Sequence, residues 1–192
     1  MKMKALRIGF AVTGSHCTYA AIVEPMKELC AKGNTLIPIL SSAAATTSTR
    51  FGEAEYWRKT FADISGHQVI SSIKEAEEIA TNKLDVVVVA PCTGNTLGKL
   101  ANAITDTAVT MVVKAHLRNE KPVVLAISTN DGLGGNAVNI GRLLDKKNVY
   151  FVPFGQDNPK EKPRSLVCKM SLLADTIECA CQGVQIQPLL IR

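Results

Sequence analysis

Leu84-Asp85-Val86-Val87-Val88-Val89-Ala90 is the most strand-like stretch of this 192-residue sequence, and Pro91 follows it. A near-continuous valine run indicates a strand buried on both faces, because a strand with one solvent-facing side alternates apolar and polar residues. Such strands occur in parallel sheets that are covered by helices on both sides. The stretch therefore predicts an α/β fold, with the strand ending at Pro91.

Similar segments lie on either side of this run. Further β-rich segments occur at residues 7–12, 35–40, 68–70, 122–127 and 149–152. Stretches with helical spacing occur at residues 19–32, 52–64, 73–82, 95–104, 106–119, 137–147 and 166–182. With right-handed crossovers, this alternation predicts a doubly wound parallel sheet of about five to six strands between two layers of helices. The expected fold class is a Rossmann-like, flavodoxin-like three-layer α/β domain.

The length of 192 residues indicates one domain. We expect a core over about residues 5–155, followed by a C-terminal loop, helix and tail over residues 156–192. A chain of this size needs no disulfide or metal for stability. Its six cysteines include no C-x-x-C pair, so we expect no metal site and a reducing, cytoplasmic setting.

Charge and hydropathy disfavour two kinds of partner. The net charge of +5 is spread along the chain, and aromatic residues make up only 5% of it. Nucleic-acid binding is therefore not expected, because it needs clustered cations or stacking platforms. No apolar run approaches the roughly 20 residues of a membrane-spanning helix, and the first residues do not resemble a secretory leader. We expect no membrane partner, whereas a small acidic ligand is compatible with the charge.

Hydroxyl-rich loops follow the first two predicted strands. Gly14 and Ser15 come after the first, and Ser41 and Ser42 open a polar segment after the second. A glycine and a hydroxyl residue at a helix N-terminus offer donors and the positive end of the helix dipole, which suit a phosphate. Neighbouring strand ends form the ligand crevice of such sheets, so we expect both loops to bind one mononucleotide phosphate. The alternatives are that Ser15 only caps a helix and that the second loop is a flexible connection.

The residues after the valine run form the most specific motif. Thr93 and Asn95 stand where a helix would be capped, and Thr96 adds a hydroxyl in the first turn. The stretch from Pro91 to Asp106 resembles the P-A-S-A-N-T-I-A-K-I-A-x-G-x-A-D pattern of the flavoprotein family. These homo-oligomeric, flavodoxin-like proteins include flavin-dependent cysteine decarboxylases and prenylated-flavin synthases. The identical positions are Pro91, Asn95, Thr96, Lys99, Ala101 and Asp106.

The resemblance covers about residues 5–155 and implies FMN as the cofactor and a homo-oligomeric assembly. The residues it implies around the phosphate and ribityl groups are Gly14, Ser15, Ser41, Ser42, Thr93, Gly94, Asn95 and Thr96. Residues 130–134 and 148–159 are similar to one member of the family, an oxidoreductase subunit that acts with a partner A subunit. That likeness implies oxidation of a small cyclic dicarboxylate to an aromatic one, with the flavin accepting hydride. Arg50, Lys99 and the backbone of residues 134–136 are candidates to bind the carboxylates.

The chain also departs from other branches of this family. Residues 128–136 replace the P-x-M-N-x-x-M-W segment with which the decarboxylases hold substrate, and only His67 stands near the third strand, where they place a catalytic histidine. Gly94-Asn95 departs from a basic residue in the corresponding loop of the prenylated-flavin synthases. The alternatives are therefore a non-redox binding or scaffold subunit with a vestigial flavin pocket, and a decarboxylase or flavin prenyltransferase.

Several single side chains have two interpretations. Cys92 precedes a helix N-terminus, where a lowered pKa gives a nucleophilic thiolate; otherwise it is a small residue packed near the flavin. His16 either donates to the phosphate or polarises a substrate, or else it faces solvent. His116 stands late in a predicted helix, where the dipole favours a cation. Trp57 and Tyr56 are either core residues or subunit contacts.

Overall fold

The valine run forms the central strand of the sheet, β3 (Val86–Cys92), and every residue of β3 is buried. The computed structural model describes residues 5–81 and 83–191. Strands β1 (Arg7–Val12) and β4 (Val123–Thr129) flank β3, while β2 (Thr35–Leu40) pairs with β1 and β5 (Val149–Phe151) pairs with β4. All of these pairs are parallel, so the predicted α/β fold class is confirmed.

Two short strands extend the sheet in the antiparallel direction, which the sequence pattern did not predict. β7 (Leu166–Cys168) pairs with the end of β4, and β6 (Phe154–Gly155) pairs with β7. The prediction that a helix begins at residue 166 is wrong, because this segment alternates buried and half-buried residues as a strand does. Helix α8 (Leu173–Cys181) begins only after the short 3₁₀ helix η2 (Met170–Leu172).

Two other strand predictions are also corrected. Residues 68–70 form no strand in the described part of the chain, where Ile70 makes an isolated bridge to β2. Pro91 does not end β3, which continues through Cys92, and the register against β4 shifts after Val89. Proline has no N–H to donate, so an irregular part of the ladder accommodates it.

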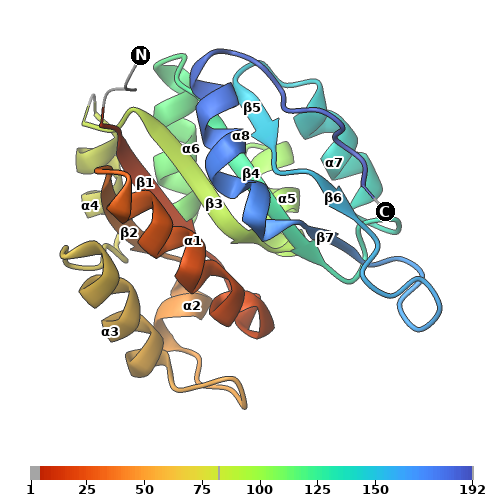
Figure 1. Ribbon diagram of the computed structural model, residues 1–192, viewed down its shortest axis with the longest axis horizontal. Helices are drawn as coiled ribbons and strands as arrows, with labels where there is room; N and C mark the ends of the chain where they lie inside the picture. Colours follow the sequence, from red (N-terminus) through yellow and green to blue (C-terminus); the bar gives the residue numbers. More distant parts are fainter. Residues whose placement is uncertain (1–4, 82, 192) are drawn as a thin grey trace.

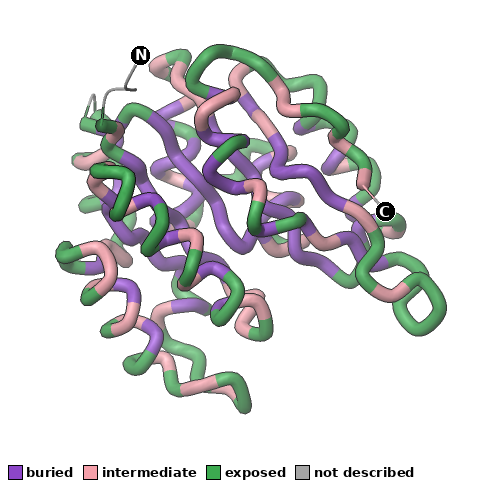
Figure 2. The backbone as a smooth tube through the Cα atoms, in the orientation of Figure 1, coloured by how far each residue is buried: buried purple, intermediate pink, exposed green. Residues whose placement is uncertain are grey.

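Helices cover both faces of the sheet and give the fold three layers (Figure 1). On one face lie α1 (Tyr19–Ala31) and α8, with α3 (Ala54–Ser65) packed beside α1 near β2. The other face carries α4 (Ile73–Ala80), α5 (Gly94–Ala101), α6 (Ala108–Arg118) and α7 (Ala137–Leu144). The short helices η1 (His16–Thr18) and α2 (Ser42–Thr46) follow β1 and β2. Buried residues concentrate in the sheet between these layers (Figure 2).

The predicted end of α4, residue 82, lies outside the described residues.

Within residues 5–81 and 83–191, no helix has the length and apolar character needed to cross a bilayer.

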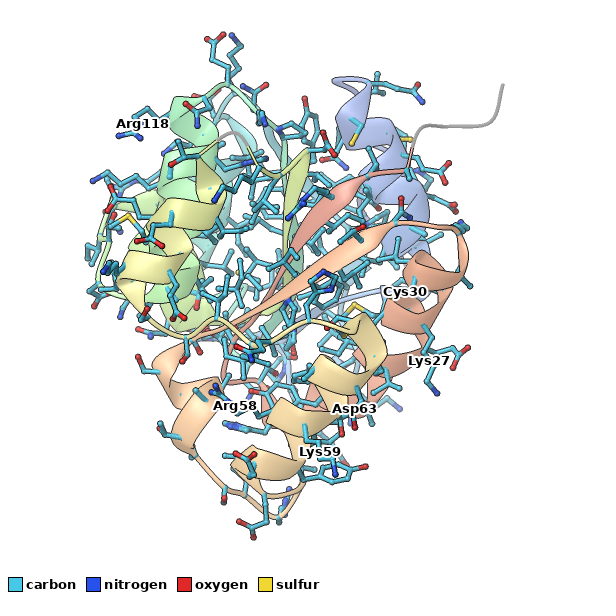
Figure 3. The ribbon with its side chains drawn as sticks, turned by 90° about the vertical axis from the view of Figure 1, so that its left-hand side faces the viewer. Lys27, Cys30, Arg58, Lys59, Asp63 and Arg118 are labelled. Atoms are coloured by element: carbon cyan, nitrogen blue, oxygen red, sulfur yellow. The ribbon has the colours of Figure 1, made fainter. Side chains whose placement is uncertain are left out.

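An aromatic cluster joins α1 to α3. Trp57 is only 7% exposed, and its ring centroid lies 5.8 Å from that of Phe61 and 5.4 Å from that of Tyr19. Trp57 is therefore a core residue, whereas Tyr56 is 60% exposed and lies outside the core. Lys59 projects from the outer side of α3 (Figure 3). The α3 helix thus buries one aromatic face and leaves the other face to solvent.

The prediction of a cationic His116 near the end of α6 is wrong. The side chain is 0% exposed, and neither ring nitrogen has a hydrogen-bond partner among the described residues. Burial lowers the pKa of His116 to about 4, and the positive charge of Lys121 contributes to this shift. His116 is therefore neutral in the folded protein at neutral pH.

We expect His116 to make the protein less stable in mild acid. An unfolded histidine, with a pKa near 6.5, takes up a proton as the pH falls, whereas folded His116 does so only near pH 4. The folded pKa is the lower one, so the free energy of unfolding falls through this window. The expected loss between pH 7.5 and pH 5 is about 2 kcal/mol, measured by urea unfolding at each pH. The variant His116→Leu should lose this slope, and an equal slope in the variant would contradict the assignment.

Candidate functional site

Two adjoining cavities lie at the carboxyl ends of the parallel strands. The larger cavity has a volume of about 700 Å³ and the smaller cavity about 480 Å³, and Gly14 and Thr93 line both. The smaller cavity lies among the loop after β1 and the starts of α2, α5 and α6. The larger cavity lies among the loop after β1, residues 49–51, the end of β4 and the segment from β6 to β7. Both volumes fall in the range of small-molecule sites, about 300–1,000 Å³.

All eight residues predicted to surround FMN line these two cavities. Ser41, Ser42, Asn95 and Thr96 line the smaller cavity, Ser15 and Gly94 line the larger one, and Gly14 and Thr93 line both. The fold thus brings together three loops that are far apart in the sequence.

Thr13 connects the end of β1 to the turn between β3 and α5. Its side chain is 1% exposed, and its Oγ1 donates to the carbonyl oxygen of Pro91 at 2.6 Å. The same oxygen accepts a hydrogen bond from the Thr93 backbone N–H at 3.1 Å. Thr13 was not among the predicted site residues, although a threonine directly after a buried strand and before Gly14 is a usable signal. It positions the shared wall of the two cavities.

Ser41 and Thr93 cap α2 and α5, two of the helices that begin at the smaller cavity. Ser41 Oγ accepts from the Ala44 N–H at 3.2 Å, and Thr93 Oγ1 accepts from the Thr96 N–H at 3.3 Å. The hydroxyl oxygens of Thr93 and Thr96 lie 3.0 Å apart. Capping uses a lone pair of the oxygen, so a capping hydroxyl remains able to donate its hydrogen to an anion. The starts of α2 and α5 therefore present hydroxyl donors to the smaller cavity.

Ser15 occupies the N-cap position of η1, as one interpretation predicted, but its side chain makes no capping bond within the described residues. Its Oγ lies 2.8 Å from Thr18 Oγ1 and 2.8 Å from Ser128 Oγ, and these two oxygens lie 2.9 Å apart. In this hydroxyl triangle each O–H can donate to the next, so one bond must open before a hydroxyl donates to a ligand. Thr18 and Ser128 were not predicted as site residues, although Ser128 stands near the end of a predicted strand.

The carboxylate of Asp131, with its two donors Thr129 and Asn136, packs behind Gly94; we call these three residues the carboxylate cluster. Thr129 Oγ1 donates to Asp131 Oδ1 at 2.5 Å, and Asn136 Nδ2 lies 2.8 and 2.9 Å from the two carboxylate oxygens. These hydrogen bonds, first from Thr129 and then from Asn136, lower the pKa of Asp131. A Cβ atom on Gly94 would lie 2.5 Å from Asn136 Nδ2 and 2.6 Å from Thr129 Oγ1. Packing alone therefore requires glycine at this position.

The candidate carboxylate-binding groups do not share one cavity. Arg50 lines the larger cavity, whereas Lys99 lines the smaller one and pairs with Asp106 at 2.7 Å. Residues 134–136 line neither cavity, because that turn closes on the carboxylate cluster. The backbone of these three residues is therefore not placed to bind a carboxylate in either cavity.

The two catalytic candidates differ in access to the cavities. Cys92 is fully buried and lines neither cavity, and burial raises the pKa of its thiol, so the interpretation as a reactive thiolate is wrong. His16 lines the larger cavity, with its ring centroid 5.0 Å from that of Tyr19. The Nε2 atom of His16 is buried and has no hydrogen-bond partner in the part of the chain that the structure describes. Across residues 5–81 and 83–191, no three His, Cys, Asp or Glu side chains are grouped to hold a metal ion.

Comparisons with known proteins identify the family of this chain and its fold. The family model described as Flavoprotein matches residues 1–177. The B subunit of dipicolinate synthase from Bacillus subtilis (strain 168) is 49% identical over 191 residues, which cover 99% of this chain and 96% of that protein. The crystal structure of the corresponding B subunit from Bacillus halodurans is 47% identical, with a TM-score of 0.91 and coverage of 100% of this chain and 99% of that one.

A more distant structure shares the fold. Burkholderia xenovorans DmrB, solved in complex with FMN, has a TM-score of 0.67 at 18% identity, over 90% of this chain and 93% of that one. The family model and the full-length relatives together show that the chain belongs to the flavoprotein family.

Proposed function

We propose that this chain is the B subunit of a dipicolinate synthase, binds FMN in the two adjoining cavities and takes part in the oxidation of dihydrodipicolinate to dipicolinate. The observation that carries the proposal is the convergence of all eight predicted cofactor residues on these cavities. The 49% identity over 191 residues to the B subunit of a dipicolinate synthase supports the choice of enzyme. The proposal includes a partner A subunit, a homo-oligomeric assembly and a place in the cytosol of the sporulating mother cell.

The donors around the cavities fit FMN. The smaller cavity offers hydroxyls, an amide and the N-terminus of α5, which suit phosphate and ribityl oxygens. Lys99 adds a cation there, although its pairing with Asp106 offsets that charge. A Cβ atom on Gly14 would lie 3.3 Å from the Cβ of Ala43, so a side chain at this position would narrow the space between the loops after β1 and β2. The chain thus offers neutral hydrogen-bond donors to an anionic cofactor, and the glycine lets the cofactor come close to the backbone.

The chain contributes binding and orientation to the proposed reaction. Bound FMN supplies the hydride acceptor, since aromatisation removes two electrons and two protons from the substrate ring. The hydroxyls of Ser41 and Thr96 bind the cofactor's polar end in the smaller cavity. We assign acceptance of a substrate proton to the His16 side chain, which lines the larger cavity; because its Nε2 is buried and unpartnered among the described residues, the ring must turn to present this atom to substrate.

The test is a titration of the purified protein with FMN, followed by quenching of flavin fluorescence. We expect Thr96→Val to weaken FMN binding about tenfold, because it removes a hydroxyl from the smaller cavity while keeping the shape. Thr46→Val is the matched control, since this exposed threonine of α2 does not line either cavity. With the A subunit present, addition of dihydrodipicolinate should bleach the flavin band at about 450 nm. Failure of the wild-type protein to bind FMN at tens of micromolar would refute the cofactor assignment.

The same samples separate the alternatives. A scaffold role is favoured by the hydroxyl triangle, whose members can satisfy one another without a ligand. If turnover with the A subunit is unchanged in Thr96→Val at an FMN concentration near the wild-type Kd, the scaffold alternative is favoured. Release of carbon dioxide or formation of a prenylated flavin would instead identify a decarboxylase or a flavin prenyltransferase.

A further inference from the structure

A tight turn presents Arg50 and Phe51 to the larger cavity. Thr49 and Gly52 exchange both of their backbone hydrogen bonds, at 3.1 and 3.0 Å, on either side of these two residues. The Nε1 of buried Trp57 donates to the carbonyl oxygen of Phe51 at 3.0 Å. Gly52 has a φ of +129°, a conformation that L side chains rarely adopt. The tip of this loop is therefore fixed in position by the core beneath it.

The two side chains of the tip form an aromatic surface with an adjacent cation. Phe51 is 42% exposed, and the guanidinium carbon of Arg50 lies 4.9 Å from the centroid of its ring. The Arg50 guanidinium covers part of this ring as a cation–π contact, and the rest of the ring is open to a ligand. A planar anionic ring would cover Phe51 by stacking and would place a carboxylate near the guanidinium.

A second cation lines the same cavity from another loop. Lys162 stands between β6 and β7, and its Nζ lies 3.4 Å from Asp157 Oδ2. The Lys162 side chain is 52% exposed, so little free energy is lost when it exchanges this partner for another carboxylate. Asp157 itself accepts a hydrogen bond from the hydroxyl of buried Ser165 at 2.7 Å, which holds the loop in place.

We propose that Arg50, Phe51 and Lys162 form a subsite for a planar aromatic dicarboxylate. Its ring stacks on Phe51, one carboxylate pairs with Arg50 and the other pairs with Lys162. The charges agree with this assignment, because Arg50 and Lys162 outnumber Asp157 among the ionised side chains that line the cavity. The subsite rests on the proposed function and deepens it by naming the residues that bind the aromatic product of the reaction.

The test measures binding of dipicolinate to the purified protein, with and without added FMN, by calorimetry. We expect Arg50→Gln to weaken dipicolinate binding about tenfold and Lys162→Gln and Phe51→Leu several-fold, whereas FMN affinity stays unchanged. Lys160→Gln, on the same loop as Lys162, and Lys59→Gln, on the surface of α3, are matched controls that remove a charge outside the cavity lining. Picolinate, which has one carboxylate, should bind the wild type more weakly than dipicolinate does. Its affinity should also fall less in Lys162→Gln.

Each other outcome has a defined meaning. Wild-type affinity for dipicolinate in Arg50→Gln overturns the subsite, and so does absence of dipicolinate binding to the wild type at millimolar concentration. A tenfold loss of FMN affinity in Arg50→Gln also overturns it, because the residue then serves the cofactor. If the wild type binds dipicolinate through Arg50 but never binds FMN, the flavin role in the proposed function fails and the subsite stands.

Discussion

Thr13→Val is expected to lower the free energy of unfolding by about 3 kcal/mol and to weaken FMN binding at least tenfold. The substitution keeps the side-chain shape but removes the hydroxyl that donates to the Pro91 carbonyl and accepts from the Thr93 N–H. At 1% exposure, no water can take its place in these bonds. Each buried group left unpaired costs about 1–3 kcal/mol. Urea unfolding and an FMN titration measure the two effects.

Two control variants separate the hydrogen bonds from the loss of any threonine hydroxyl. Thr13→Ser keeps the hydroxyl and should retain most of the FMN affinity. Thr60→Val removes a hydroxyl that donates to the Tyr56 carbonyl on the exposed side of α3, so it should change stability by less than about 0.5 kcal/mol. If Thr13→Val and Thr60→Val have equal effects, Thr13 does not position the turn.

The central sheet and the candidate cofactor-binding loops were predictable because their signals are local. A run of valines is buried on both faces wherever it stands, so β3 followed from its own residues. The loops after β1, β2 and β3 then had to meet, since parallel strands bring their carboxyl ends to one edge. Gly14, Ser41 and Thr93 could therefore be grouped from their places in the sequence.

The rest depended on contacts between distant segments. The helical spacing at residues 166–182 gave no sign that its first residues pair with the end of β4. Cys92 and His116 lie next to polar or terminal positions in the sequence, yet the layers that pack over them bury both. The hydroxyl triangle also escaped prediction, because the meeting of strand ends does not determine that the side chains of Ser15 and Ser128 turn toward each other. Side-chain exposure and partners are properties of the packed layers rather than of the local pattern.

Gly94→Ala is expected to lower the free energy of unfolding by about 2 kcal/mol and FMN affinity more than tenfold. The added Cβ would lie 2.5 Å from Asn136 Nδ2, 2.6 Å from Thr129 Oγ1 and 2.9 Å from Asp131 Oδ1. These three side chains hold one another by hydrogen bonds of 2.5 to 2.9 Å, so none can move aside without breaking a bond. The start of α5 must shift instead, and with it the turn that lines both cavities.

Gly98→Ala is the matched control, because it makes the same change one turn later in α5. Its Cβ would meet Asn139 Nδ2 at 3.5 Å, an ordinary contact, so alanine should stabilise the helix by about 0.5–1 kcal/mol and leave FMN affinity unchanged. A double variant with Asn136→Ala removes the nearest obstructing atom. Both substitutions act on the contact between residue 94 and the Asn136 side chain. The loss of FMN binding free energy in Gly94→Ala/Asn136→Ala should therefore be smaller than the sum of the losses in the two single variants. Additive losses would show that Gly94 acts on the cofactor directly and not through the carboxylate cluster.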